Sequence, residues 1–192
     1  APVVAEVASE LGIVTLAAVA TPFEFEGRRM NVAWKGINEL DRHADAVILF
    51  PNEGITEALG GEISMRDAFS FIDRQIEHAI EGIARVVNAP GLINIDIADV
   101  CSMMNGVGLC VVGSGTASGP DRARLAAQEA LYFPSMRVIQ PLNRRRVLVS
   151  IAASRTVGLD EVGSVSAPYG IRRLMTRRSS EVQLTTSQWL IG

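Results

Sequence analysis

The chain has 192 residues, of which 48% are hydrophobic and 20% charged, a composition typical of a globular protein with a substantial core. The longest apolar run near its start, residues 11–20, is about half of the roughly 20 residues that a membrane span needs, so we expect a soluble, cytoplasmic protein without direct membrane insertion. Cys101 and Cys110 lack zinc-site spacing and are too few for a disulfide framework, so we expect two small core residues and no metal site.

Charge is unevenly distributed, although the net charge is only -3. Residues 1–100 hold 16 of the 21 acidic residues but only seven of the 18 basic ones, so the second half is basic. The basic residues are almost all arginines without interleaved aromatic residues, and we expect no nucleic-acid partner. The asymmetry favours head-to-tail self-association, in which the basic end of one molecule meets the acidic end of the next, and it equally suits an ordinary solvated surface.

The first half predicts alternating helices and strands. Residues 2–11 read as a helix already in progress, with Val3, Val4, Val7 and Leu11 on one face, so we expect that preceding residues are missing. Apolar runs at 12–20 and 46–50 predict strands of a parallel sheet buried on both faces, and 29–43 between them has helical spacing. This succession indicates an α/β fold.

The clearest helix spans residues 64–87. Ser64 and Asp67 have capping-box spacing, and apolar residues then recur every three or four positions over about 35 Å. The stop signals at 88–91 end the helix, and we place a domain boundary near there.

The second half predicts a more mixed order of elements. We expect a helix at 97–104, a strand at 108–112, a glycine-rich turn at 113–119, a helix at 121–131, a strand at 146–153, a helix at 160–175 that Gly163, Pro168 and Gly170 interrupt or distort, and a last strand from 181.

Polar groups stand among aliphatic residues in GLINIDIADV, residues 91–100. Asp96 and Asp99 have the spacing of a helix cap, which explains them structurally. Together with Asn94 they also have the chemistry to orient and polarise a water molecule. Both interpretations stay open, because a capping carboxylate can also be catalytic.

Two other segments follow predicted strands. GSGTASG, residues 113–119, is either a tight strand-to-helix turn or an anion-binding loop, although it matches neither common phosphate-loop pattern and the sole lysine, Lys35, lies elsewhere. TPFEFEG, residues 21–27, lies at the carboxyl end of the first strand, where ligands bind in open α/β sheets.

The segments APVVAEVASELGIVT, TPFEFEG, ISMRDAF, GIARVVNAPGLINIDIADV and GSGTASGPDRA, in this order, resemble the FtsZ family of bacterial cell-division GTPases in the tubulin superfamily. The resemblance implies an α/β fold with three parts: the second half of a Rossmann-like GTPase domain (residues 1–63), a central helix (64–90) and an α+β activation domain (91–192). It also implies GTP or GDP as ligand, Mg²⁺ as cofactor, head-to-tail filaments, other division proteins as partners and a cytoplasmic location at the division site.

Site residues follow from the same resemblance. Residues 91–100 resemble the family's synergy loop, which implies that Asn94, Asp96 and Asp99 complete GTP hydrolysis on a neighbouring subunit. On the nucleotide side it implies that Phe69 stacks on guanine, Asp73 binds the guanine edge and Glu26 lies near the ribose. Either Arg29 or Arg28 matches the arginine beside the base.

One part of the family pattern is not found in these 192 residues. The glycine-rich GGGTGTG loop that cradles the phosphates would immediately precede the segment that matches Ala1. We therefore interpret the chain as the carboxyl-terminal part of an FtsZ-like GTPase, inactive alone. The alternatives are a non-enzymatic module that binds or caps FtsZ filaments, and an unrelated α/β enzyme that uses GSGTASG to bind an anion.

Overall fold

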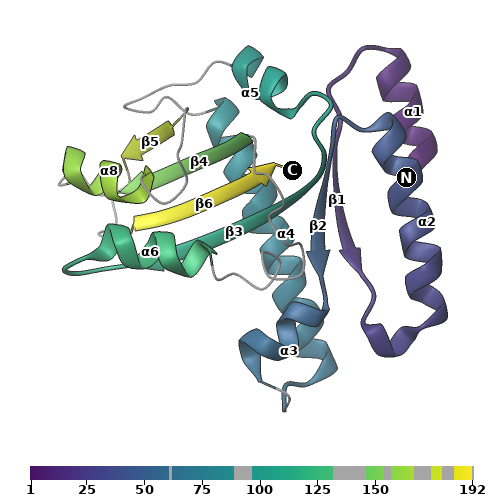
Figure 1. Ribbon diagram of the computed structural model, residues 1–192, viewed down its shortest axis with the longest axis horizontal. Coiled ribbons are helices and arrows are strands. Elements are labelled where there is room, and N and C mark those ends of the chain that lie inside the picture. Colours follow the sequence, from purple (N-terminus) through teal and green to yellow (C-terminus); the bar gives the residue numbers. More distant parts are fainter. Residues whose placement is uncertain are drawn as a thin grey trace.

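The computed structural model describes residues 1–60, 62–88, 97–131, 146–153, 157–166, 174–178 and 184–191 (Figure 1). The elements in chain order are α1 (Pro2–Glu10), β1 (Leu16–Thr21), the short 3-10 helix η1 (Glu24–Glu26), α2 (Arg28–His43), β2 (Ala46–Pro51), α3 (Glu53–Leu59), α4 (Met65–Asn88), α5 (Ile97–Met104), β3 (Gly108–Ala117), α6 (Arg122–Leu131), β4 (Arg146–Ala153), α8 (Leu159–Ser166), β5 (Leu174–Arg178) and β6 (Leu184–Ile191). Helices and strands alternate through α2 and β2, as the α/β prediction requires.

The described strands form one six-stranded sheet in the order β1-β2-β3-β6-β4-β5. β1, β2 and β3 are parallel, and β6 runs antiparallel between β3 and β4. β3 pairs with β2 through residues 108–111 and with β6 through residues 110–117. One sheet therefore joins the regions predicted as separate domains, and the division at residues 63 and 90 stays a prediction.

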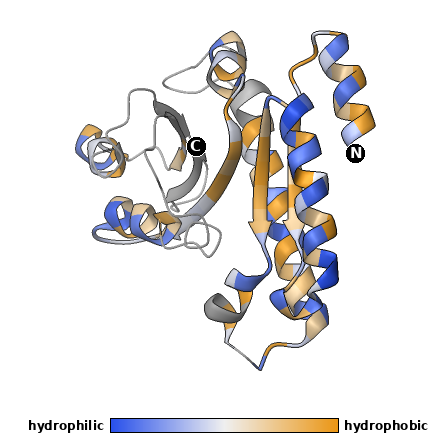
Figure 2. Ribbon diagram, turned by 45° about the vertical axis from the view of Figure 1, so that its right-hand side comes forward, coloured by the Kyte–Doolittle hydropathy of each residue, from blue (hydrophilic) through white to orange (hydrophobic). Residues whose placement is uncertain are grey.

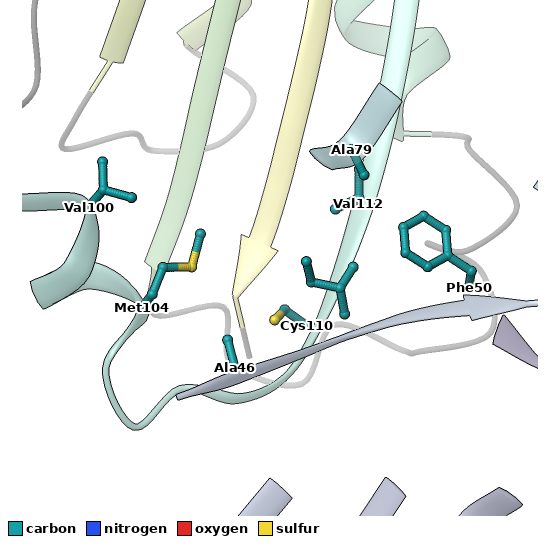
Figure 3. Packing of buried hydrophobic residues seen from close by; sticks show 8 residues of the cluster. Ala46, Phe50, Ala79, Val100, Met104, Cys110 and Val112 are labelled. Carbon is teal, nitrogen blue, oxygen red and sulfur yellow. The ribbon is translucent and has the colours of Figure 1, made fainter. Parts of the chain in front are cut away.

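β2 lies at the centre of the first half, because all six of its residues are buried. Since side chains alternate across a strand, Val47 and Leu49 pack with α1 and α2, whereas Ala46, Ile48 and Phe50 face α4 and α5. The second face also holds Ala79, Val100, Met104, Cys110 and Val112 (Figure 3). β2 is thus shared by two hydrophobic layers.

Cys110 points into this second layer, as the prediction of a small core residue requires (Figure 3). Its thiol lies 3.5 Å from the carbonyl oxygen of Val47, to which it donates a weak hydrogen bond. Burial raises the pKa of the Cys110 thiol to about 12, so the group is a neutral thiol at physiological pH. Cys101, on α5, is partly exposed.

α1 ends earlier than predicted and β1 begins later. Gly12 has φ +67° and the amide of Ile13 donates to the carbonyl of Ala8 at 2.9 Å, which closes the helix. The strand predicted from residue 12 therefore starts at Leu16. Only Ala5 of α1 is buried, so the apolar face predicted for this helix does not face the core of the described chain.

The glycine-rich turn predicted at 113–119 is wrong for most of its length, because β3 continues to Ala117. Gly115 is buried directly beneath α6, where an added Cβ would lie 2.0 Å from the carbonyl oxygen of Ala126. Glycine is needed here so that the α6 backbone can approach the strand. The segment is therefore a packing surface, which removes both the phosphate-loop interpretation and the unrelated enzyme based on it.

We predict that Gly115→Ala destabilises the chain by about 1–3 kcal/mol or more, because the methyl group would push α6 off the sheet. Gly36→Ala on α2 is the matched control: its Cβ would meet nothing within 4 Å, and alanine favours a helix by about 0.5–1 kcal/mol. Urea unfolding of both variants measures the difference. Equal midpoints for Gly115→Ala and the unchanged chain would contradict the close approach.

The helix predicted at 160–175 is shorter than expected. α8 ends at Ser166, two residues before Pro168, and β5 already begins at Leu174. The extension of this helix to residue 175 is therefore wrong, and the helix passes through Gly163. Pro168 and Gly170 lie outside the described residues, so their effect on the helix stays a prediction.

A bidentate ion pair joins α8 to α6. Arg122 Nε and Nη2 donate to the two carboxylate oxygens of Glu161 at 2.6 and 2.9 Å, and the amide of Gly158 adds a third hydrogen bond. The Arg122 guanidinium, followed by the Gly158 amide, lowers the pKa of Glu161 below its ordinary value. The folded state therefore favours the ionised carboxylate.

We predict that Glu161→Gln makes the chain less sensitive to acid. A lowered native pKa contributes stability above the ordinary glutamate pKa of about 4.3, and this contribution disappears as the pH falls through the native pKa. The variant should melt lower than the unchanged chain near neutral pH but lose less melting temperature on acidification. Glu10→Gln on exposed α1 is the control, and parallel melting curves for all three proteins would contradict the role of the pair.

Candidate functional site

The segments that follow β1 and β2 lie at one edge of the sheet. Thr21 and Pro51 end these two parallel strands and pair with each other. η1 therefore follows β1, and Asn52 follows β2, on the same side of the molecule. Carboxyl ends of parallel strands are where ligands bind in open α/β sheets, so this edge is the candidate site.

Three phenylalanines from two elements meet at this edge. Phe23 is 6% exposed and stacks on Phe25, with ring centroids 5.1 Å apart and planes at 12°. Its ring also makes an edge contact with Phe69 of α4, at 6.1 Å and 66°. Phe69 remains 47% exposed, so part of its ring is accessible and its position is fixed by Phe23.

A small hydrophobic cluster supports Phe69 from below. Phe23, Ile55, Ala68 and Ile72 are all buried and pack together, which joins η1, α3 and the first turns of α4. The amide of Asp67 donates to Ser64 Oγ at 3.1 Å, and this cap fixes the start of α4 as predicted. The beginning of α4 is therefore held firmly against the strand ends.

Glu26 and Arg29 form the charged part of the edge. One Glu26 oxygen accepts the Phe23 amide at 2.9 Å, and the other accepts Arg29 Nη1. The Arg29 side chain is 78% exposed, whereas that of Glu26 is 16% exposed. The sequence left open whether Arg28 or Arg29 lies beside the base. The ion pair with Glu26 is made by Arg29, which favours Arg29.

Asn52 was missed by the sequence interpretation. It is only 4% exposed, and its Oδ1 has no hydrogen-bond partner among the described residues. Leaving a buried amide oxygen unpaired costs about 1–3 kcal/mol, so such an atom is expected to meet a donor that the described chain does not supply. Its position directly after a fully buried strand was a usable signal.

Asp73 lies one helical turn beyond Phe69 on α4 and is exposed. Residues four apart share one face of a helix, so the carboxylate of Asp73 and the ring of Phe69 point to the same side. The structure thus brings Phe69, Glu26 and Arg29 to one edge of the sheet. Asp73 lies one turn further along α4, the helix that carries Phe69.

The other candidate residues lie elsewhere. Asn94 and Asp96 fall outside the described residues. Asp99 is in the first turn of α5 and is half-buried, while Val100 and Met104 of the same helix pack beside Ala46, the first residue of β2.

Asp99 and Phe69 are therefore near opposite ends of the sheet. Phe69 lies where β2 ends, whereas α5 packs where β2 begins (Figure 1). β2 between them has six residues, and a strand of that number is about 20 Å long. Within one chain, Asp99 therefore cannot reach the aromatic edge, the sheet edge at which Phe23, Phe25 and Phe69 meet.

Two features are absent from the described residues. No helix there is long and apolar enough to cross a bilayer. That part of the chain also contains no group of three or more histidine, cysteine, aspartate or glutamate residues that could hold a metal ion.

Comparisons with known proteins identify the fold. The model of the tubulin/FtsZ family GTPase domain matches residues 1–60. The solved structure of a W319Y mutant of FtsZ from M. jannaschii superposes with a TM-score of 0.89 at 28% identity, covering 100% of this chain and 60% of that one. CetZ2 from Haloferax volcanii, at 17% identity and a TM-score of 0.78, shares the fold.

Similarity to individual proteins indicates the family within this fold. The cell division protein FtsZ of Wigglesworthia glossinidia brevipalpis is 42% identical over 166 residues, 86% of this chain and 43% of its own length. FtsZ of Pseudomonas putida is 40% identical over 181 residues, 92% of this chain and 46% of its own length. The chain spans less than half the length of these two relatives.

The fold is that of the tubulin superfamily, with a candidate site at the carboxyl ends of its parallel strands. Within that superfamily the chain belongs to the FtsZ family, as its sequence resemblance predicted.

Proposed function

We propose that the edge formed by η1, Asn52 and the start of α4 is the base-binding part of a guanine-nucleotide site. The observation that carries this proposal is the half-exposed ring of Phe69, held in place by Phe23. A fixed aromatic ring with an accessible face offers a nucleobase a stacking surface worth about 1–3 kcal/mol. Membership of the FtsZ family supports the choice of GTP and GDP as ligands.

Polar groups at the same edge suit a guanine rather than an adenine. The Asp73 carboxylate accepts hydrogen bonds only, and guanine presents two adjacent N–H donors on its edge. Asn52 Oδ1, which has no partner among the described residues, is a second acceptor in need of a donor. Glu26 and Arg29 would contact the ribose side of the nucleotide, with the exposed guanidinium free to adjust to the ligand.

Binding by this chain alone should be weak. The 192 residues contain no GGGTGTG segment, and the glycine-rich segment 113–117 is strand. Mg²⁺ binds proteins mostly through one or two carboxylates together with substrate phosphates, and the described residues contain no ready metal cluster. Mg²⁺ would therefore reach this site bound to the nucleotide, and the chain itself would supply base recognition.

We predict that GTP binds the chain better than ATP and that Phe69→Ala weakens GTP binding about tenfold by removing the stacking surface. Saturation-transfer NMR suits the measurement because it detects weak ligands and shows which ligand protons touch the protein. Trp34→Ala, which removes an exposed aromatic ring of α2, is the matched control and should bind GTP normally. Equal binding of ATP, or equal loss in both variants, would remove the base-site assignment.

We further propose that Asp99, with Asn94 and Asp96, acts on the nucleotide of a neighbouring molecule. Asp99 and the aromatic edge lie near opposite ends of the sheet, so only a second molecule stacked head to tail would bring the two together. The solved FtsZ dimer from M. jannaschii, 28% identical to this chain, supports self-association in the family. In the whole protein these carboxylates would orient the attacking water during GTP hydrolysis.

This role fits the cellular setting of the relatives, which are cell division proteins. We propose that the whole protein assembles into filaments in the cytoplasm at the division site, together with other division proteins. The alternative function is a module that caps FtsZ filaments without catalysis. It would use the same α5 end of the chain, but it would not stimulate GTP hydrolysis by the neighbouring molecule.

We predict that the chain stimulates phosphate release by P. putida FtsZ held below its own assembly concentration, because α5 would complete the active site of the partner. Asp99→Ala should reduce this stimulation to background while still associating with FtsZ. The control, Glu39→Gln on surface helix α2, should stimulate normally.

Two other outcomes decide between the functions. With P. putida FtsZ raised above its assembly concentration, inhibition of phosphate release with shortened filaments, unchanged by Asp99→Ala, would establish the capping module instead. Absence of any association between the chain and P. putida FtsZ would contradict both.

A further inference from the structure

The carboxylate of Glu53 joins two segments of the candidate site that are distant in the sequence. Glu53 is the first residue of α3 and directly follows the buried Asn52. It accepts a hydrogen bond from the backbone amide of Glu24, the first residue of η1. In Figures 1 and 2, the paired strands β1 and β2 end at the lower side of the molecule, next to α3. The bond therefore ties the segment that follows β1 to the segment that follows β2.

The bond from Glu53 differs in kind from the bonds within η1. Inside η1, the carbonyl of Phe23 accepts the amide of Glu26 at 3.0 Å, and the Glu26 carboxylate accepts the amide of Phe23 at 2.9 Å. These two bonds close the turn on itself and determine its shape. Glu53 belongs to a different element, so its bond to the Glu24 amide determines where the closed turn lies relative to α3.

The position of η1 reaches the proposed stacking ring through Phe23. Phe23 precedes the bonded amide and packs with Ile55 of α3 and Ile72 of α4. Hydrophobic contacts of this kind are non-directional, whereas a hydrogen bond has a preferred distance and angle. The Phe23 ring meets the edge of Phe69, whose ring remains accessible. A shift of η1 would therefore be passed to Phe69 by the Phe23 ring.

We propose that Glu53 is a positioning residue of the base site. By accepting the Glu24 amide it fixes η1, and through Phe23 it sets the orientation of the Phe69 ring on which the base stacks. This inference rests on the base-binding function proposed above. In this role Glu53 acts through other residues and does not contact the nucleotide. A ring that is already held in its binding orientation loses less freedom when the base stacks on it, so the bond favours binding.

The charge of Glu53 and its hydrogen bond have opposite effects on GTP binding. GTP is an anion, so a carboxylate at this edge repels it, and removing the charge alone should strengthen binding. Removing the hydrogen bond should weaken binding, because η1 and the Phe69 ring would be held less firmly. Glu53→Gln removes the charge but keeps a side-chain oxygen that can accept the Glu24 amide, whereas Glu53→Ala removes both. The two substitutions therefore separate positioning from electrostatics.

The test measures the dissociation constant of GTP for the chain by saturation-transfer NMR titration. We expect Glu53→Ala to weaken binding about two- to tenfold, the factor that corresponds to one hydrogen bond, and Glu53→Gln to bind at least as tightly as the unchanged chain. In a chain that already carries Phe69→Ala, adding Glu53→Ala should cause no further loss, because its effect passes through that ring. Glu39→Ala removes a surface carboxylate of α2 and is the matched control, which should bind GTP normally.

Hydrogen exchange checks the contact itself, since the Glu24 amide should exchange faster in Glu53→Ala than in Glu53→Gln. The proposal is overturned if Glu53→Ala binds GTP as tightly as the unchanged chain, if Glu53→Gln loses as much affinity as Glu53→Ala, or if Glu53→Ala causes the same loss with and without the Phe69 ring. Normal binding by Phe69→Ala alone would remove the base site together with this role. Weakened binding by Phe69→Ala but not by Glu53→Ala would overturn only the role of Glu53.

Discussion

The burial of β2 is the constraint on which the rest of the structure depends. A strand with six buried residues and side chains in two hydrophobic layers holds α1 and α2 on one face and α4 and α5 on the other. Both candidate regions are placed by it, because the aromatic edge lies where β2 ends and α5 packs where it begins. The fold therefore keeps the aromatic residues at one end of β2 and Asp99 of α5 at the other.

Much of this arrangement could be predicted from periodicity. α4 and α5 were expected within a residue of their observed bounds, since regular apolar spacing and a serine cap determine where such helices lie. The candidate base residues came from the family resemblance rather than from spacing. The structure brings Phe69, Glu26 and Arg29 to one edge of the sheet, while their roles stay predictions.

What sequence patterns missed depends on contacts between distant segments. Gly115 was interpreted as part of a turn. In a sequence, a glycine that leaves room for a neighbouring helix cannot be distinguished from a glycine that adopts a positive φ in a turn. The position of Asn52 after a predicted strand was a usable signal, but its burial and the lack of a partner for its Oδ1 among the described residues are visible only in three dimensions. The apolar face of α1 was recognised from its spacing, but periodicity does not say whether such a face is buried, and in the described chain it is exposed.

The environment of Cys110 has a practical consequence for experiments on α5. A thiol that is buried and protonated in the native chain does not compete for maleimides or other thiol reagents. Cys101 is then the more accessible of the two cysteines, and it lies two residues beyond Asp99 on the same short helix. A fluorophore or spin label could be attached beside the proposed catalytic carboxylate without mutagenesis, so that the natural sequence carries its own reporter for the arrival of a neighbouring subunit.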